Sequence, residues 1–270
     1  AYKGGGYYFG DCFVSQLDIS LIGQNQLTYS TFLGGNNSDI GYGIISENGY
    51  ITVAGKTSSC DFPTTATAFD ATFNNRPGGS SGDGFISHIN PSASLPFQLV
   101  FSTFLGGSPQ TFQGNYYEGD DFIFGIVKHP LGYLVGGITS SVDFPTTTTA
   151  WNRNLLYNNS FMTVLSLDGH SLKASTYVGL PVSCENVFGF DIDNLGNVIA
   201  TGLATLATSP VTPGAFQSVC NGYPSYSDAF VVKFDPLLRR VLYYSFLGGN
   251  HQEQAQAICS DGNDGCVLVG

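Results

Sequence analysis

Charged residues are scarce in this sequence. Asp, Glu, Lys and Arg make up 11% of the 270 residues, and only nine of them are Lys or Arg, against 20 Asp or Glu. The basic residues stand singly apart from Arg239-Arg240, and the formal net charge is −11. Because binding to a nucleic-acid backbone depends on clustered Lys and Arg, we expect no nucleic-acid partner.

Long apolar runs are missing as well. No segment reaches the roughly 18 apolar residues that a membrane-spanning helix requires, so we predict no membrane span. The opening residues Ala1-Tyr2-Lys3-Gly4 lack the pattern of a secretory signal peptide and indicate a mature or internal start. Histidine is also rare, and the four histidines fall at four different positions of the repeat described below: His88, His129, His170 and His251. We therefore expect no metal and no cofactor.

The six cysteines form no C-x-x-C pair, which argues against a zinc site. An even number of cysteines permits up to three disulfides. Cys259 and Cys266 flank a predicted hairpin turn, and Cys184 and Cys220 lie in predicted long loops of one repeat. The sequence therefore predicts three bridges: Cys259–Cys266, Cys184–Cys220 and, from the remaining residues, Cys12–Cys60.

The polar character of the chain comes from Gly, Ser, Thr and Asn, and glycine alone contributes 35 residues. Such a composition is typical of secreted or cell-surface proteins, so we expect an extracellular or surface location. Two N-glycosylation sequons are present, and their candidate acceptors are Asn36 and Asn158.

The chain is organised around an internal repeat. The motif Tyr-Ser-Thr-Phe-Leu-Gly-Gly at residues 29–35 returns at residues 101–107 and, in altered form, at 174–179 and 243–249. Equivalent glycines are spaced by 72, 73 and 69 residues: Gly34, Gly106, Gly179 and Gly248. A fixed period of this kind indicates a repeat architecture. The predicted repeats span residues 10–81, 82–157, 158–226 and 227–270, the last being incomplete, within a single domain of residues 1–270.

Each repeat contains four short β-like runs and no helical periodicity. The first run places a phenylalanine at one position, and an apolar residue four positions later shares its strand face. We expect the phenylalanines to be buried and equivalent: Phe13, Phe85, Phe161 and Phe230. The opposite face is mixed and includes Gln16, His88 and Lys233, so we expect His88 to tolerate substitution. The second run is the organising motif, and the third and fourth runs form a hairpin, marked by Asn48-Gly49 in the first repeat.

A loop motif, Ser-x-Asp-Phe-Pro-Thr-Thr, follows the hairpin at residues 59–65 and 141–147, and an Ala-aromatic pair follows it. We interpret this segment as an ordered crossover held by a buried aromatic residue: Phe69, Trp151 or Phe216. Four strands per repeat predict an all-β fold, a β-propeller of about four blades, each a four-stranded antiparallel sheet.

Together these motifs resemble the SBBP family of β-propeller repeats. The resemblance rests on D-x-F-V-x-x-L-D, Y-S-T-F-L-G-G, G-I-x-x-x-x-N-G-x-x-x-V-A-G and S-x-D-F-P-T-T, and it covers nearly the whole chain. The third repeat departs from the pattern at Gly179-Leu180 and loses the Asp-Phe of the loop. The resemblance implies an extracellular or surface-associated protein and supplies no catalytic residues.

One insertion, residues 108–121, is a candidate ligand site because loops on a rigid scaffold often bind ligands. Its aromatic residues Phe112, Tyr116 and Tyr117 are suited to stacking on a sugar, and its carboxylates Glu118, Asp120 and Asp121 to holding sugar hydroxyls or Ca²⁺. The sequence therefore favours a non-enzymatic structural or adhesive module that assembles with copies of itself into a filament or larger array. The predicted contacts involve residues 1–10 and 253–270, and the insertion at 108–121 is a further candidate contact. A glycan-binding propeller is the alternative.

A glycoside-active enzyme is the least favoured reading. Its candidate carboxylate pairs are Asp120 with Asp121 and Asp191 with Asp193. Adjacent residues on a strand point to opposite faces, and Asp191 and Asp193 precede an ordinary turn.

Overall fold

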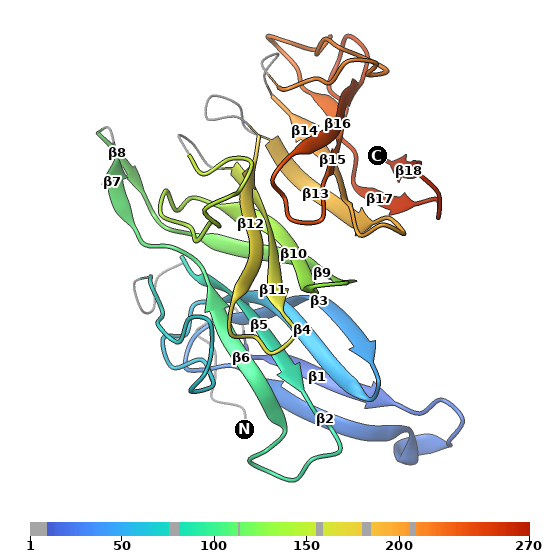
Figure 1. Ribbon diagram of the computed structural model, residues 1–270. Coiled ribbons are helices and arrows are strands. Elements are labelled where there is room, and N and C mark those ends of the chain that lie inside the picture. The colour runs from blue at the N-terminus through green and yellow to red at the C-terminus, as the bar shows by residue number, and fades with distance from the viewer. Residues whose placement is uncertain (1–9, 76–80, 113, 155–158, 180–184, 206–208) are drawn as a thin grey trace.

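A computed structural model describes residues 10–75, 81–112, 114–154, 159–179, 185–205 and 209–270. Within these residues the regular structure is β-strand apart from one short 3-10 helix, Gly23–Gln26 (Figure 1). The prediction of an all-β chain built from four-stranded antiparallel sheets is confirmed.

The strands form five sheets that follow one another along the chain, and a separate hairpin extends from them. Sheet 1 contains β1 (Cys12–Leu17) and β2 (Leu27–Leu33); sheet 2 contains β3 (Asp39–Glu47), β4 (Tyr50–Thr57), β5 (Asp83–Ile89) and β6 (Leu99–Leu105); sheet 3 contains β9 (Asp121–His129), β10 (Gly132–Thr139), β11 (Asn159–Ser166) and β12 (Leu172–Val178); sheet 4 contains β13 (Glu185–Ile192), β14 (Val198–Ala204), β15 (Asp228–Phe234) and β16 (Val241–Leu247); sheet 5 contains β17 (Ala257–Ser260) and β18 (Cys266–Val269); the hairpin is β7 (Gln110–Phe112) and β8 (Asn115–Tyr117).

The sheets do not coincide with the repeats of the sequence. Each four-stranded sheet joins the third and fourth strands of one repeat to the first and second strands of the next. Gly34-Gly35 and Gly106-Gly107 lie in the connections that lead from one sheet to the next, whereas the Asp-Phe-Pro loops return the chain to the sheet it has just left. Sheets 1 and 5 are consequently two-stranded, and within the described residues β1 pairs only with β2 and β18 only with β17.

The predicted Asn-Gly hairpin between β3 and β4 is present. Asn48 and Gly49 both adopt positive φ, 53° and 80°. Two consecutive positive φ angles match the right-handed twist of the flanking strands, which is why Asn-Gly is favoured at this turn.

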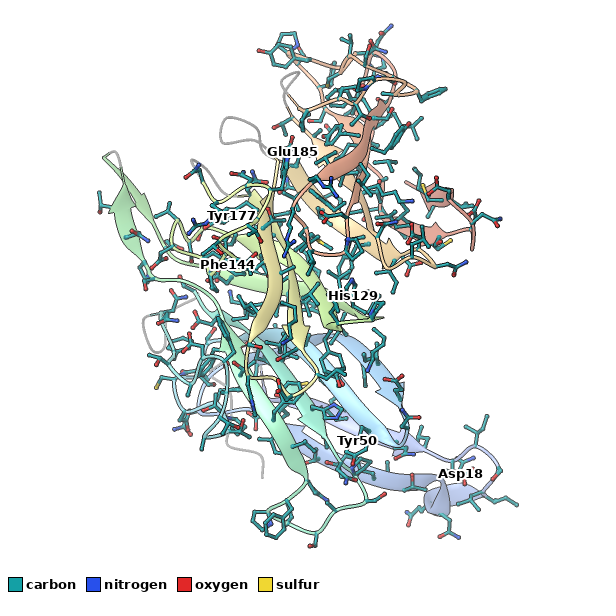
Figure 2. The ribbon with its side chains drawn as sticks, in the orientation of Figure 1. Asp18, Tyr50, His129, Phe144, Tyr177 and Glu185 are labelled. Atoms are coloured by element: carbon teal, nitrogen blue, oxygen red, sulfur yellow. The ribbon has the colours of Figure 1, made fainter. Side chains whose placement is uncertain are left out.

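The phenylalanine position of the first run is buried in sheets 2, 3 and 4. Phe85, Phe161 and Phe230 have no exposed surface, as predicted. The loop phenylalanine of the preceding Asp-Phe-Pro motif covers two of them: the ring centroids of Phe62 and Phe85 lie 4.5 Å apart, and those of Phe144 and Phe161 lie 4.2 Å apart. Phe144 also packs near Tyr177, whose hydroxyl donates to the Ser141 carbonyl at 2.8 Å (Figure 2).

The prediction was wrong for Phe13, whose side chain is 70% exposed. It lies on the outer face of sheet 1, whereas its equivalents lie between two successive sheets: Phe85 packs in one core with Val14 and Leu33 of sheet 1, and Phe161 with Ile86 and Leu105 of sheet 2. The aromatic residues that we expect to anchor the loops also differ in burial. Trp151 packs against Phe234 with ring centroids 5.6 Å apart, but Phe216 is exposed and does not serve as a buried anchor.

His88, which the sequence predicts to tolerate substitution, is half-buried. Its ring stacks between Tyr50 and Phe101, at centroid distances of 5.0 and 5.3 Å, and Thr52 Oγ1 lies 2.8 Å from its Nδ1. Desolvation lowers the pKa of His88, and the nearby Lys128 adds to this effect. Both faces of β5 are therefore covered, because sheet 2 lies between sheets 1 and 3.

Candidate functional site

A polar junction connects sheet 1 to sheet 2. Asp39, at the start of β3, accepts hydrogen bonds from the Gly35 backbone N–H at 2.9 Å and from Ser59 Oγ at 3.0 Å. The neighbouring Asp61 accepts one from the Asn36 backbone N–H at 2.8 Å. The Gly-Gly of the organising motif and the Ser-x-Asp of the loop motif are therefore parts of one structure.

The same junction connects sheet 2 to sheet 3. Asp121 accepts from the Gly107 N–H at 2.8 Å and from Ser141 Oγ at 2.9 Å, and Asp143 accepts from the Ser108 N–H at 2.8 Å. A Cβ added to Gly107 would lie 2.5 Å from both Asp143 Oδ1 and Ser141 Cβ. This close approach explains why the motif has glycine at that position.

We expect Ser141→Ala to lower the free energy of unfolding by about 1–3 kcal/mol, because it removes a donor from a buried carboxylate. Ser141 and Asp121 are both fully buried. The control is Ser94→Ala, at an exposed position, for which a change within about 0.5 kcal/mol is expected. Urea unfolding of the two variants measures the difference, and equal stabilities would contradict a structural role for the junction.

Two buried carboxyl groups converge on Gly106, the first glycine of the second motif. A Cβ added to Gly106 would lie 2.7 Å from Asp121 Oδ2 and 3.0 Å from Asp83 Oδ1. Burial raises the pKa of Asp83 to about 6 and raises the pKa of Asp121 well above its usual range. At the corresponding glycine of the third repeat, Gly179, the pair consists of Glu185 and the amide of Asn159. In the third repeat, the amide of Asn159 therefore replaces the carboxyl group that Asp83 has in the second repeat.

The predicted ligand site at residues 108–121 is only partly described. Phe112, Tyr116 and Tyr117 lie on the β7–β8 hairpin, which protrudes from the sheets (Figure 1), but their side chains lie outside the described part. Glu118 is exposed, and its Oε2 lies 3.5 Å from Ser81 Oγ. Asp120 pairs with Lys56 at 2.7 Å, and Asp121 belongs to the junction. Two of the three carboxylates are therefore engaged by the fold.

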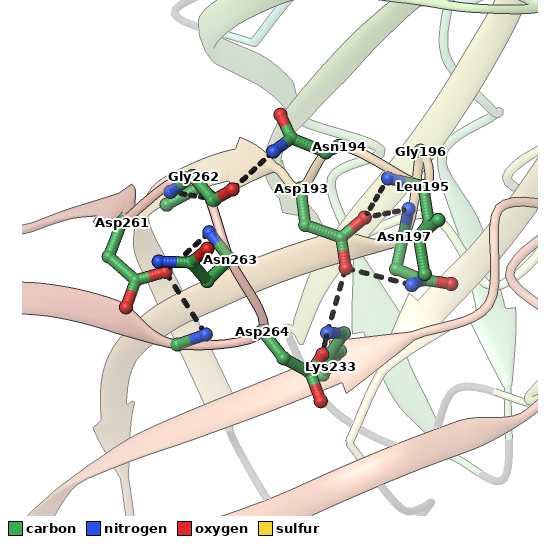
Figure 3. Close-up of polar contacts among 12 residues, drawn as sticks. Asp193, Asn194, Leu195, Gly196, Asn197, Lys233, Asp261, Gly262, Asn263 and Asp264 are labelled. Carbon is green, nitrogen blue, oxygen red and sulfur yellow. Dashed lines mark hydrogen bonds and ion pairs between the residues drawn. The ribbon is translucent and has the colours of Figure 1, made fainter.

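Asp193 and Asp191, the other candidate carboxylate pair, are also engaged by the fold. Asp193 accepts from the backbone N–H groups of Leu195 and Asn197 at 2.8 and 2.9 Å, and its second oxygen lies 2.7 Å from Lys233 Nζ (Figure 3). Burial opposes ionisation, but the Lys233 and Asn197 donors outweigh it and lower the pKa of Asp193 to about 2. Asp191 accepts from the Ser260 backbone N–H at 2.9 Å, and Lys233 also pairs with Asp264, so these groups attach sheet 5 to sheet 4.

The disulfide predictions were wrong for the described cysteines, which are all free thiols: Cys12, Cys60, Cys220, Cys259 and Cys266. In the β17–β18 register Cys259 lies opposite Val267, and Cys266 opposite Ser260, so the two cysteines are offset by one residue and point to opposite faces. Cys12 is buried and Cys60 is exposed. Burial raises the pKa of the Cys12 thiol to about 11. Cys184 lies outside the described residues, as does the sequon Asn158, whereas Asn36 is exposed.

Sheet 1 has an exposed apolar face. Phe13 and Leu17 of β1 are 70% and 62% exposed, and their cross-strand partners Phe32 and Leu27 are 47% and 52% exposed. We call these four residues the head surface. In sheet 2 the corresponding residues Phe85, Ile89 and Phe104 are buried, because that face packs against sheet 1.

Sheet 4 partly exposes the face that, in sheets 1, 2 and 3, is covered by the following sheet. Leu247 occupies the position of Leu33, Leu105 and Val178, which are all buried under the following sheet, but Leu247 itself is 38% exposed. Val231 likewise corresponds to the buried Val14 and is half-buried. A groove of about 460 Å³ runs beside β18 and is lined by Val231, Lys233, Tyr243 and Cys266 among others. We call Val231, Tyr243, Leu247 and Cys266 the tail surface.

Comparison with known proteins does not identify the chain: no family model matches it, and no curated protein does. In the described part of the chain, no helix has the length and apolarity needed to cross a membrane. A search of the same residues finds no group of three or more His, Cys, Asp or Glu side chains arranged to hold a metal ion.

Proposed function

We propose that this chain is a non-enzymatic, extracellular structural module that associates end to end with copies of itself, forming a filament or larger array. One observation carries the proposal. Sheet 1 contains only the first and second strands of a repeat, and sheet 5 contains only the third and fourth strands. These two half-sheets lie at opposite ends of the molecule (Figure 1). In sheets 2, 3 and 4, the fourth strand of one repeat always pairs with the first strand of the next. β18 and β1 are strands of these two kinds, and neither has such a partner among the described residues.

Apolar burial supplies the driving force for this association. The head surface contains four large apolar side chains and no charged residue. Large contiguous apolar patches on a protein surface mark interaction sites. A heterologous contact that joins the head of one copy to the tail of another, without closing, produces a filament.

We further propose that the sheets are blades of a β-propeller of the SBBP type. The regular succession of sheets, one for each period of the sequence, supports this assignment. The absence of a catalytic role is also part of the proposal, because the fold employs Asp120, Asp121 and Asp193 in ion pairs and junctions. Glycan binding by the protruding β7–β8 hairpin is the second candidate function, favoured by its projection from the body of the molecule (Figure 1).

We expect the protein to form oligomers whose size rises with protein concentration and with salt, since salt screens the repulsion between copies of net charge −11. Phe13→Asp should remove the association, because it places a charge in the apolar contact. The matched control is Phe97→Asp, at a position that is 73% exposed and belongs to neither surface. Light scattering and negative-stain microscopy are the measurements, and a wild-type protein that stays monomeric under all conditions would refute the proposal.

A further inference from the structure

We infer the register of this contact: β18 of one copy pairs antiparallel with β1 of the next, with Gly270 opposite Phe13, so that the two half-sheets form one four-stranded sheet in the order β17-β18-β1-β2. The partner is a second copy of this chain. This inference rests on the proposed function and specifies its structural basis.

Three pairings within the chain define the register. A glycine at the end of the fourth strand lies opposite the phenylalanine of the first strand in sheets 2, 3 and 4; the pairs are Gly55–Phe85, Gly137–Phe161 and Gly202–Phe230. The pairing is the same although the three sheets differ in sequence. The hairpin of the third and fourth strands therefore pairs with a first strand in a single register, with the glycine opposite the phenylalanine.

Gly270 is the equivalent glycine of sheet 5. A Cβ added to Gly55, Gly137 or Gly202 would collide with a backbone carbonyl of the adjacent third strand, at Ile40, Phe122 or Asn186. A Cβ added to Gly270 would collide in the same way with the Gln254 carbonyl. Gly270 is thus placed as the other three are, and its counterpart in a first strand is Phe13.

The register matches the apolar surfaces. With Gly270 opposite Phe13, Val269 lies opposite Val14 and Cys266 opposite Leu17. Leu17 and Phe13 share the face of β1 that forms the head surface, and Cys266 lines the groove of the tail surface. A register shifted by one residue would turn Phe13 and Leu17 away from that groove, because strand side chains alternate between faces.

The groove beside β18 lies where strands β1 and β2 of the second copy would pack against sheet 4. Sheet 5 packs against sheet 4 mainly through β17, since a Cβ added to Gly189 of β13 would lie 2.7 Å from the Ala257 Cα. The groove beside β18 is lined by residues of β14, β15 and β16. In sheet 3, β11 occupies the corresponding place beside β10 and covers Ile86 of sheet 2 with Phe161. The partner's β1 would cover Val231 in the same manner.

The test is an engineered disulfide in the full chain. Directly opposed residues of antiparallel strands have Cα atoms about 4.5–5.5 Å apart, within the range that a disulfide bridges. In a background of Cys60→Ser and Cys259→Ser, Leu17→Cys should form an intermolecular bond with the native Cys266 under mild oxidation. Gln16→Cys in the same background is the control, and we expect about tenfold less of its cross-link because its side chain points to the other face. A second pair, Ser15→Cys with Leu268→Cys, tests the same register should Leu17→Cys weaken association.

Each outcome is decisive for the inference. Peptide mapping of a mixture of isotopically labelled and unlabelled chains should find mixed cross-links between position 17 and Cys266. If light scattering shows association but neither Leu17→Cys nor the Ser15→Cys and Leu268→Cys pair cross-links more than the control, the register is wrong. The proposed function would still stand in that case. Cross-links confined to single chains would show ring closure and overturn the intermolecular pairing. Absence of association would overturn both proposals.

Discussion

Replacing Phe161 with alanine is expected to lower the free energy of unfolding by about 3–5 kcal/mol. The side chain is fully buried and contacts Phe144 at a centroid distance of 4.2 Å. Its removal leaves a cavity between sheets 2 and 3 that the surrounding β-strands cannot easily close, because strand positions are held by backbone hydrogen bonds. Urea unfolding, followed by the fluorescence of the single tryptophan Trp151, measures the loss.

Phe13→Ala is the matched control, because Phe13 has the same position in the repeat and is 70% exposed. In dilute, monomeric protein its effect should stay within about 0.5 kcal/mol. The same variant should weaken self-association, since Phe13 belongs to the head surface. Equal destabilisation by Phe13→Ala and Phe161→Ala in the monomer would contradict the assignment of Phe13 to an outer face.

The second large effect is a dependence of stability on pH through Asp83. Burial raises its pKa from 3.8 to about 6, so the folded state binds the proton more tightly than the unfolded state. This contribution to stability is fully present below about pH 4 and is lost as the pH rises through 6. A difference of about two pKa units corresponds to roughly 3 kcal/mol.

Other groups titrate in the same range, so the measurement is a comparison between wild type and Asp83→Asn. Desolvation lowers the pKa values of His88 and His129, and their contributions are lost as the pH falls below 6.5, which opposes the effect of Asp83. These terms cancel in the comparison. The stability of Asp83→Asn relative to wild type should rise by about 2–3 kcal/mol between pH 4 and pH 7.

The third repeat makes this substitution structurally reasonable, because it has the amide of Asn159 at the position of Asp83. Chemical unfolding at several pH values gives the two profiles. Parallel profiles for wild type and Asp83→Asn would show that Asp83 does not carry a shifted proton in the folded protein. The contribution of Asp39 to stability should likewise decrease as the pH rises, because burial raises the pKa of Asp39 as well.

Local features of the fold were predictable from the sequence. The Asn48-Gly49 turn follows from the backbone angles that this dipeptide accepts, and the burial of Phe85, Phe161 and Phe230 follows from the period of two along a strand. The four-strand repeat was visible because its motifs recur at a nearly constant spacing. These are properties of short segments, for which the chain itself supplies the information.

The candidate site was less accessible to sequence reasoning. Asp83 and Asp121 are far apart in sequence and converge only because Gly106 admits both. The ion pair between Asp120 and Lys56 forms because β4 of sheet 2 lies beside the segment that precedes β9 of sheet 3. Two of the three carboxylates of the predicted ligand site, Asp120 and Asp121, are therefore used by the fold for its own connections.

Taken by itself, the amino-acid sequence determined the strands, the hairpin turns and the repeat, because periodicity and turn chemistry act over a few residues. Only the tertiary structure decided which faces are covered. Phe13 and Phe161 have the same motif but opposite environments, since a sheet packs over one and not over the other. The register likewise separated Cys259 from Cys266, because a displacement of one residue reverses the face of a strand. The head and tail surfaces arise from this difference: the same motif position is buried in the core where another sheet packs over it and is exposed where none does.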